Sequence, residues 1–217
     1  MTGFLLPVRE ACADALALLL PIGCAGCDEP DVSLCPPCAA ALAPDPRRQL
    51  VEAPDGAVAV WSGLAFEGVA ARVLRAIKED GRTSLARALA PALSAALVCA
   101  DAGDGVLLVP MPTSSRAYRR RGFRVPELLV RRCGHRASTL LRHVRRTADQ
   151  RGLDRGARVR NVAQSLVATG GAGARIVLVD DVVTTGASLA EAVRALRCAG
   201  AEVVGAVTVA ATPRKGS

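Results

Sequence analysis

The chain has 217 residues, of which 51% are hydrophobic, and this is enough apolar material for one ordinary domain and a small appendage. The formal net charge of +8 favours a polyanionic ligand such as DNA or pyrophosphate. Aromatic residues make up only 2%, which weakens the case for a non-specific single-strand binder that stacks bases on rings, and no stretch approaches a membrane span.

The first quarter of the chain divides into three predicted parts. Residues 4–20 have a helical pattern, residues 21–40 hold a cluster of cysteines, and residues 43–55, rich in proline and charge, are typical of a linker. The apolar run that ends before Cys24 superficially resembles a lipid-attachment signal. Acidic residues precede that run and Pro21 breaks it, so we predict no export signal.

Two CxxC pairs stand close together in the cysteine-rich part, Cys24-Ala25-Gly26-Cys27 and Cys35-Pro36-Pro37-Cys38. Thiolates two residues apart on a tight turn can bind one tetrahedral metal, and two such turns supply the four ligands of a structural zinc site. A disulfide pair or a redox CxxC are the alternatives. We predict Zn²⁺ here, because redox motifs rarely come doubled at this spacing.

The other cysteines, Cys12, Cys99, Cys133 and Cys198, have no partner by spacing. Cys99 and Cys198 lie in apolar helical contexts and are expected to be buried small hydrophobic residues. Free thiols, a zinc pattern and the missing export signal together indicate a reducing interior, so we expect a cytoplasmic protein without membrane insertion.

The middle of the chain alternates predicted strands and helices. Apolar residues from Val58 to Phe66 fall on alternate positions, as in a strand pair or a bent strand, and a helix with one apolar face follows and ends at Lys78. A second helix spans Leu85 to Leu93, starting or bending at Pro91, and precedes the strand Val106–Val109.

The segment after this strand is the most charged part of the chain. Pro110 and Met111 begin a proline-held turn that could present backbone amides to a ligand, and Arg116 and Arg119 belong to an arginine-rich stretch that extends to Arg124. Such a segment can fold over a pyrophosphate as a mobile loop, or it can be a solvated basic face. His135 and His143 lie among arginines and are expected to be surface residues without a catalytic role.

The most informative segment runs from Ile176 to Ser188. Four aliphatic residues are followed by Asp180 and Asp181, and then by a turn rich in hydroxyls and glycine. The aliphatic run predicts a buried parallel strand, and the 3.6-residue period from Ser188 to Cys198 predicts a helix. With a final strand over 203–210, these elements form a βαβ unit.

A loop between such a strand and helix can aim backbone N–H groups and hydroxyls at a phosphate, helped by the helix dipole. The phosphate-binding candidates of this loop are Val182, Val183, Thr184, Thr185, Gly186, Ala187 and Ser188. Paired carboxylates can accept hydrogen bonds from ribose hydroxyls, and hydrated Mg²⁺ can bridge to a pyrophosphate. The alternative is an ordinary strand whose exposed end carries acids in a helix-capping turn.

This segment resembles the phosphoribosyl pyrophosphate (PRPP) signature of type I phosphoribosyltransferases, and nearly the whole chain resembles the ComF family, associated with bacterial competence and DNA uptake. The motifs that carry the second resemblance are the four cysteines, Lys78, Val109-Pro110-Met111-Pro112, Arg121-Gly122-Phe123, Thr147 with Gln150, Arg158 with Asn161-Val162, and the PRPP signature. Arg124-Val125 stands where the family usually has Asn-Gln, and Glu79 stands where a tyrosine is common.

The resemblance implies an α/β fold, a mainly parallel twisted sheet flanked by helices, with an N-terminal zinc module over 1–45 and a phosphoribosyltransferase-like domain over 46–217. It implies that Asp180 and Asp181 hold the ribose, while Lys78, Arg116, Arg119 and Mg²⁺ neutralise pyrophosphate during transfer to an acceptor. The alternative is a non-catalytic adaptor that binds PRPP, a nucleotide or single-stranded DNA for a DNA-uptake or recombination partner.

Overall fold

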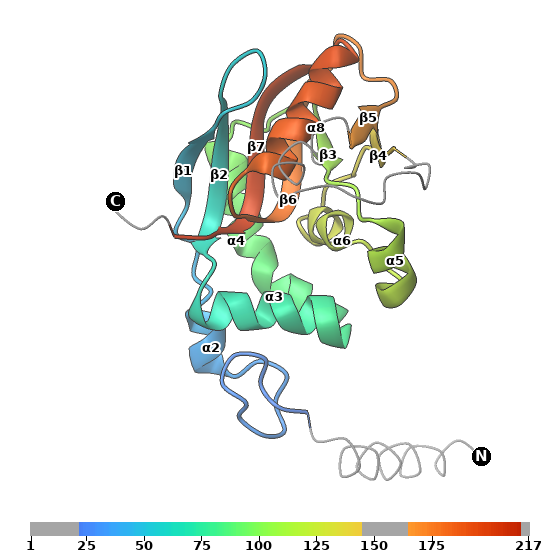
Figure 1. Ribbon diagram of the computed structural model, residues 1–217. Helices are drawn as coiled ribbons and strands as arrows, with labels where there is room; N and C mark the ends of the chain where they lie inside the picture. The colour runs from blue at the N-terminus through green and yellow to red at the C-terminus, as the bar shows by residue number, and fades with distance from the viewer. Residues whose placement is uncertain (1–21, 145–164, 214–217) are drawn as a thin grey trace, which may run out of the picture.

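The computed structural model describes residues 22–144 and 165–213. Its main feature is a five-stranded sheet in the order β1-β2-β7-β6-β3 (Figure 1). The strands are β1 Arg47–Val51, β2 Val58–Ala65, β7 Glu202–Ala211, β6 Arg175–Val183 and β3 Val106–Pro110. The four strands from β2 to β3 pair in parallel, and β1 is an antiparallel edge strand.

The remaining described elements are short helices, longer helices and a ribbon. They are α2 Pro36–Ala40, α3 Gly68–Asp80, a 3₁₀ turn at Thr83–Leu85, α4 Ala86–Cys99, α5 Ser115–Arg121, α6 Val125–Arg132, α8 Ala187–Cys198, and the antiparallel strands β4 Leu141–His143 and β5 Leu166–Ala168. Within the described ranges, no helix has both the length and the apolar character needed to cross a membrane.

Side chains of β6 alternate between two cores. Val177 and Val179 pack in one cluster with the apolar residues of α3, α4 and α6, whereas Ile176 and Leu178 pack in another with those of α8. All four residues are fully buried. The predicted strand covered on both faces is therefore confirmed, since successive side chains of a strand point to opposite faces.

Close packing of α4 against the sheet explains a glycine in β2. A Cβ at Gly63 would lie 2.1 Å from the carbonyl oxygen of Ala92, so no larger residue fits there without moving the helix. The helix α4 begins at Ala86 and contains Pro91 in its interior, so the alternative of a helix that starts at Pro91 is wrong.

Two expectations from the sequence are corrected by the structure. The expected linker over 43–55 contains β1, which pairs with β2 from Arg47↔Ser62 to Val51↔Val58. Its polar residues are those of an edge strand whose outer side is exposed, and they concealed the strand pattern. The helix α3 also continues two residues past Lys78, to Asp80, and ends at Gly81 with a positive φ of 71°.

The expected arginine loop is helical. Ser114 caps α5 by accepting a hydrogen bond from the Ala117 backbone N–H at 3.3 Å, and Gly122, with φ of 77°, ends the helix. Helix α6 then begins at Val125 and packs its buried residues against the sheet. Capping serine and terminal glycine fix the ends of this short helix, so the arginines lie on an ordered element.

Candidate functional site

The paired acids lie at the carboxyl end of β6, beside the end of β3. Because strand side chains alternate, Asp181 follows Val177 and Val179 toward the face covered by α3. There its Oδ1 lies 2.8 Å from Nζ of Lys78, and both side chains are largely buried. The last turn of α3 thus brings a cation to an acid that is about one hundred residues away in the chain.

The carboxyl of Asp180 holds its proton unusually well. Burial and the negative charge of Asp181 raise its pKa to about 8, although the backbone N–H of Asp181 and the charge of Lys78 act in the opposite direction. The Asp181 backbone N–H donates to Oδ1 of Asp180 at 2.8 Å. Two neighbouring acids, of which only Asp181 is paired with a cation, form a site that favours additional positive charge or hydroxyl donors.

The turn after β6 needs glycine at Gly186 for two reasons. Its φ is 82°, and a Cβ there would lie 2.7 Å from Cγ2 of Val51 in β1. Thr184 and Thr185 are exposed, and the Thr185 hydroxyl accepts from the Ala187 backbone N–H at 3.4 Å. Helix α8 therefore starts directly after a turn with exposed threonine side chains, and the first turn of a helix offers N–H groups without intrahelical partners, as an anion site requires.

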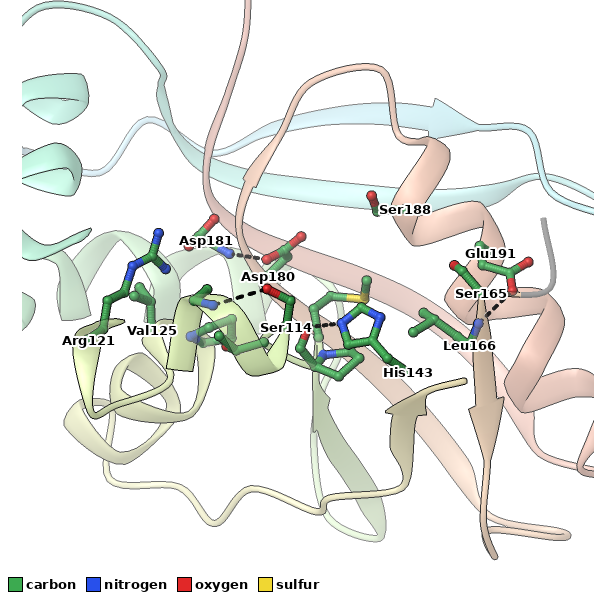
Figure 2. Close-up of a pocket in the computed structure, with 15 residues that line it drawn as sticks. Ser114, Arg121, Val125, His143, Ser165, Leu166, Asp180, Asp181, Ser188 and Glu191 are labelled. Atoms are coloured by element: carbon green, nitrogen blue, oxygen red, sulfur yellow. Dashed lines mark hydrogen bonds between the residues drawn. The ribbon is translucent and has the colours of Figure 1, made fainter. Parts of the chain in front are cut away.

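A cavity of about 250 Å³ connects the acids to this helix (Figure 2). It is lined by Met111, Pro112, Thr113, Ser114, Ala117, Arg121, Val125, Pro126, His143, Ser165, Leu166, Asp180, Asp181, Ser188 and Glu191. Of the residues singled out from the sequence, Asp180, Asp181, Ser188 and Met111 line it. The backbone N–H of Met111 donates to the carbonyl of Val179 at 2.8 Å, which holds the start of the β3 loop beside the acids.

Other expected site residues lie outside this lining. Lys78 reaches the cavity only through Asp181, and Pro110 ends β3. Arg116 and Arg119 are exposed on α5, as the alternative of a solvated basic face predicts. The residues of the turn outside the lining are Val182, Val183, Thr184, Thr185, Gly186 and Ala187.

Three lining residues were given no functional role from the sequence. Arg121 lines the cavity, and its Nε is buried without a hydrogen-bond partner among the residues described. His143 also lines it, and Glu191 of α8 is 5% exposed beside Arg194. The Glu191–Arg194 spacing of three residues on one helix was the available signal for that pair. Arg121 belongs to the Arg121-Gly122-Phe123 motif but was given no role of its own, and His143 is exposed, as the sequence predicted for it.

Residues 122–217 match the family model of the phosphoribosyl transferase domain. This range contains the acids, the turn, α8 and the β4–β5 ribbon, and it covers less than half of the chain. A comparison with curated proteins found no match. The domain match and the mainly parallel sheet flanked by helices confirm the predicted type I phosphoribosyltransferase fold class, and the match supports a phosphoribosyltransferase-like function.

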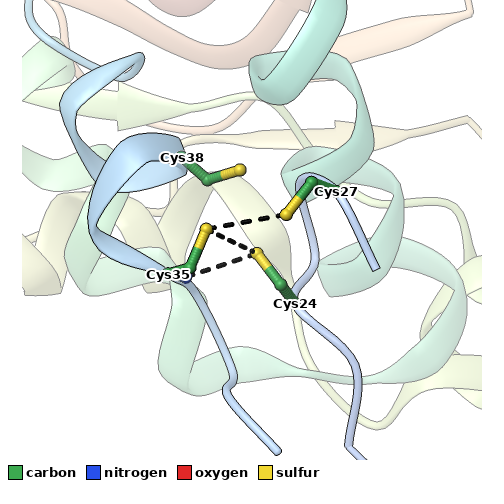
Figure 3. A group of neighbouring side chains, drawn as sticks. All are labelled: Cys24, Cys27, Cys35 and Cys38. Carbon is green, nitrogen blue, oxygen red and sulfur yellow. Dashed lines mark hydrogen bonds between the residues drawn. The ribbon is translucent and has the colours of Figure 1, made fainter. Parts of the chain in front are cut away.

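The four-cysteine cluster lies N-terminal to the matched residues. The Sγ atoms of Cys24, Cys27, Cys35 and Cys38 all lie within 4.8 Å of one another (Figure 3). Cys35 Sγ is 3.6 Å from the Sγ atoms of both Cys24 and Cys27. Four thiolates around one zinc at 2.3 Å stand about 3.8 Å apart, so the cluster can bind a metal such as zinc.

Backbone N–H groups favour the thiolate form of one of these cysteines, which is the form that binds a metal. Burial raises the pKa of the Cys24 thiol, but the N–H groups of Cys35 and Gly26, at 3.3 and 3.4 Å, contribute to lowering it to about 6. A Cβ at Gly26 would lie 2.5 Å from Cys38 Sγ, so the turn needs glycine. Donor set and geometry both fit a closed tetrahedral site.

The remaining cysteines correct one expectation. Cys99 and Cys198, expected to be buried, are exposed at the C-terminal ends of α4 and α8. Both cysteines lie off the buried stripe of their helix, so the apolar sequence around them does not bury them. The segments over 4–20 and around Thr147, Gln150, Arg158 and Asn161, with Cys12, fall outside the described residues.

Proposed function

We propose that this chain binds PRPP with Mg²⁺ in the cavity between β6, α5 and α8, and transfers its phosphoribosyl group to an acceptor. The observation that carries the proposal is one cavity bordered by both Asp180 and Asp181 and by Ser188 at the start of α8. A site built for phosphate alone has no use for two carboxylates, whereas a phosphorylated ribose needs both kinds of group.

Each part of the ligand has a chemical counterpart in this proposal. Asp180 and Asp181 accept hydrogen bonds from the ribose hydroxyls. The turn from Val182 to Ser188 holds the 5-phosphate, with the hydroxyls of Thr184, Thr185 and Ser188 and the backbone N–H groups of Gly186 and Ala187 as donors. The exposure of Thr184, Thr185 and Ser188 agrees with this role.

Pyrophosphate needs cations on the opposite side of the ribose. Lys78 is 2.8 Å from Asp181, and Arg121 lines the cavity, so these two join Arg116 and Arg119 as the proposed cationic groups. Arg116 and Arg119 contribute to the basic surface of α5. Pro110 and Met111 hold the β3 loop beside the leaving group. Carboxylate oxygens suit Mg²⁺, which supplies charge neutralisation for the leaving pyrophosphate when bound.

The reaction requires no covalent nucleophile from the protein. The bond from C1 of the ribose to pyrophosphate breaks with its electron pair leaving on oxygen, and positive charge develops at C1 and the ring oxygen. Asp180 and Asp181 stabilise that charge, and Lys78 and Arg121 stabilise the departing anion. Positioning and electrostatics therefore supply the catalysis.

The biological setting in this proposal follows the resemblance to the ComF family. The proposed setting is competence and DNA uptake in the cytoplasm. The proposed partner is a DNA-uptake or recombination protein, and single-stranded DNA is a further candidate ligand. Structural Zn²⁺ on the four cysteines holds the N-terminal module. None of the seven cysteines in the described ranges forms a disulfide, in keeping with a reducing compartment.

Calorimetry with PRPP, with and without Mg²⁺, tests the proposal. We expect magnesium-dependent binding that is weaker for ribose 5-phosphate and lost in the Asp180→Asn, Asp181→Asn variant. The matched control is Asp104→Asn, which changes an exposed acid in the turn before β3 and should bind PRPP normally.

Failure of PRPP to bind would contradict the proposal. Binding of single-stranded DNA with a steep salt dependence, no magnesium requirement and no competition by PRPP would instead favour the adaptor function. PRPP binding with retained turnover in the double variant would remove Asp180 and Asp181 from the catalytic assignment.

A further inference from the structure

His143 has a hydrogen bond that determines which ring nitrogen carries its proton. Its Nε2 lies 3.0 Å from the carbonyl oxygen of Pro112. A carbonyl oxygen only accepts, so Nε2 is the donor in this contact. Neutral imidazole carries a single N–H, and Nδ1 is therefore left with a lone pair that can accept a proton.

The His143 ring lies at the proposed ligand cavity, where the lone pair of Nδ1 can accept a proton from a bound molecule. His143 and Asp180 line the same cavity, and Figure 2 shows the imidazole between Asp180 and Leu166, below Ser188. His143 also borders a second cavity of about 480 Å³, which includes Thr139, Arg142 and Thr169. There is thus room beside the ring for a second molecule next to the proposed ribose site.

The ribbon that carries His143 is fixed to α8. His143 is opposite Leu166 in the β4–β5 pair, and the neighbouring pair is hydrogen-bonded through the N–H of Val144 and the carbonyl of Ser165 at 2.9 Å. In an antiparallel ladder bonded and non-bonded pairs alternate, so the N–H and C=O of Leu166 point away from β4.

Side chains of helix α8 form hydrogen bonds with both of these backbone groups. The Leu166 N–H donates to Oε1 of Glu191 at 3.0 Å, and Arg194 donates to the Leu166 carbonyl at 3.0 Å. Glu191 and Arg194 pair at 2.8 Å, with the glutamate buried. The helix whose first turn is the proposed phosphate site therefore also positions the residue opposite His143.

We propose that Nδ1 of His143 accepts the proton of a nitrogen acceptor during phosphoribosyl transfer, an inference that rests on the function proposed above. The acceptor nitrogen forms a bond to C1 with its lone pair, the C1–oxygen bond breaks, and the electron pair leaves with pyrophosphate. The proton of that nitrogen passes to Nδ1, and the imidazolium then releases it to water. The ligand class is a compound with an ionisable ring N–H, such as a nucleobase.

Nitrogen NMR of the full-length protein tests the geometry without relying on turnover. The chain has two histidines, both exposed, and His135, which lines neither of the two cavities, serves as the internal control. At about pH 8, where an ordinary imidazole is neutral, we expect His143 to carry its proton on Nε2, the nitrogen that contacts the Pro112 carbonyl. Addition of PRPP and Mg²⁺ should shift the His143 signals and leave those of His135 unchanged. A proton on Nδ1, or His143 signals indifferent to PRPP that binds by calorimetry, would overturn the proposal.

Kinetics of His143→Gln test the chemical role, with His135→Gln as the matched control. Pyrophosphate release is measured with PRPP, Mg²⁺ and each of the common nucleobases, beside PRPP affinity by calorimetry. We expect His143→Gln to bind PRPP normally and to react about 100-fold more slowly, while His135→Gln keeps the normal rate.

Turnover that His143→Gln leaves unchanged would contradict the role of His143 alone. Absence of turnover in the unaltered protein with every nucleobase offered would contradict both this role and the transferase activity. Loss of PRPP binding in His143→Gln would show a contribution to PRPP affinity in place of proton transfer.

Discussion

At the residue scale, Asp180 is the clearest sign of a functional site. A carboxyl whose pKa rises to about 8 lies next to Asp181, although one lysine offsets part of their repulsion. Folding alone gains nothing from this arrangement, because two hydrophobic or amide side chains would fit the end of β6 at lower cost. The arrangement is favourable once a cationic or hydroxyl-rich ligand is present.

The pH dependence of stability tests this reading of Asp180. Its pKa is higher in the folded chain, so protonated Asp180 contributes to the free energy of unfolding. This contribution is fully present below about pH 4 and is lost as the pH rises through about 8. Asp180→Asn removes this loss. We expect the variant to melt increasingly higher than the unaltered protein between about pH 5 and pH 9, measured by thermal unfolding in the absence of ligand. The exposed control Asp104→Asn should show no such trend, and a constant difference for Asp180→Asn would refute a raised pKa.

At the element scale, the contact between β1 and the turn before α8 decides the shape of the phosphate site. Gly186 combines a positive φ with a Cβ position that Val51 occupies. An edge strand that the sequence did not reveal thus closes one side of the proposed phosphate turn. The other end of α8 is also tied to the turn between β1 and β2, because Arg197 donates to the carbonyls of Pro54 and Gly56 at 2.8 and 3.0 Å.

The variant Gly186→Ala tests both constraints on this position, the positive φ and the contact with Val51. Gly81, with φ of 71° and no atom within 4 Å of an added Cβ, is the matched control for backbone strain alone. We expect Gly81→Ala to lower the free energy of unfolding by about 1–2 kcal/mol, and Gly186→Ala to lower it by about 1–3 kcal/mol more. Adding Val51→Ala to Gly186→Ala should recover part of the packing cost. Equal losses at both glycines in urea unfolding would mean that Val51 exerts no constraint.

At the scale of the whole molecule, the cysteine module is attached to the helix that carries Lys78. The guanidinium of Arg82, just past α3, donates to the carbonyls of Gly23 and Ser33, both at 2.9 Å. Ala25 and Leu42 of the module are buried in the same core cluster as α3 and α4. The domain division at residue 45 stays a prediction, and the module packs against the second part through this shared core.

Metal removal should therefore destabilise more than the module itself. We expect the purified chain to contain zinc, and Cys38→Ser to lower the free energy of unfolding by more than about 3 kcal/mol, because a buried ligand set is broken. Exposed Cys99→Ser is the matched control and should leave both metal content and stability unchanged. Metal analysis and denaturant unfolding of the three proteins check this. Native protein free of zinc, or a stable Cys38→Ser variant, would remove the structural zinc site.

The sequence by itself determined the features that are contiguous in the chain. The strand, acids, turn and helix from Ile176 to Cys198 follow one another without a gap, so periodicity and residue chemistry were enough to predict them. The spacing of the four cysteines likewise predicted their cluster. In both cases the groups that act together are neighbours in the chain, and local geometry alone brings them together.

Only the tertiary structure decided which distant side chains join the acids. Arg121 lines the cavity while Arg116 and Arg119 face solvent, and the helical phase of α5 and its packing set this difference. His143 reaches the cavity because the Glu191–Arg194 pair holds the opposite strand to α8. Strand β1 forms because β2 offers it a free edge. Such choices depend on contacts between segments far apart in the chain, and no local pattern records them.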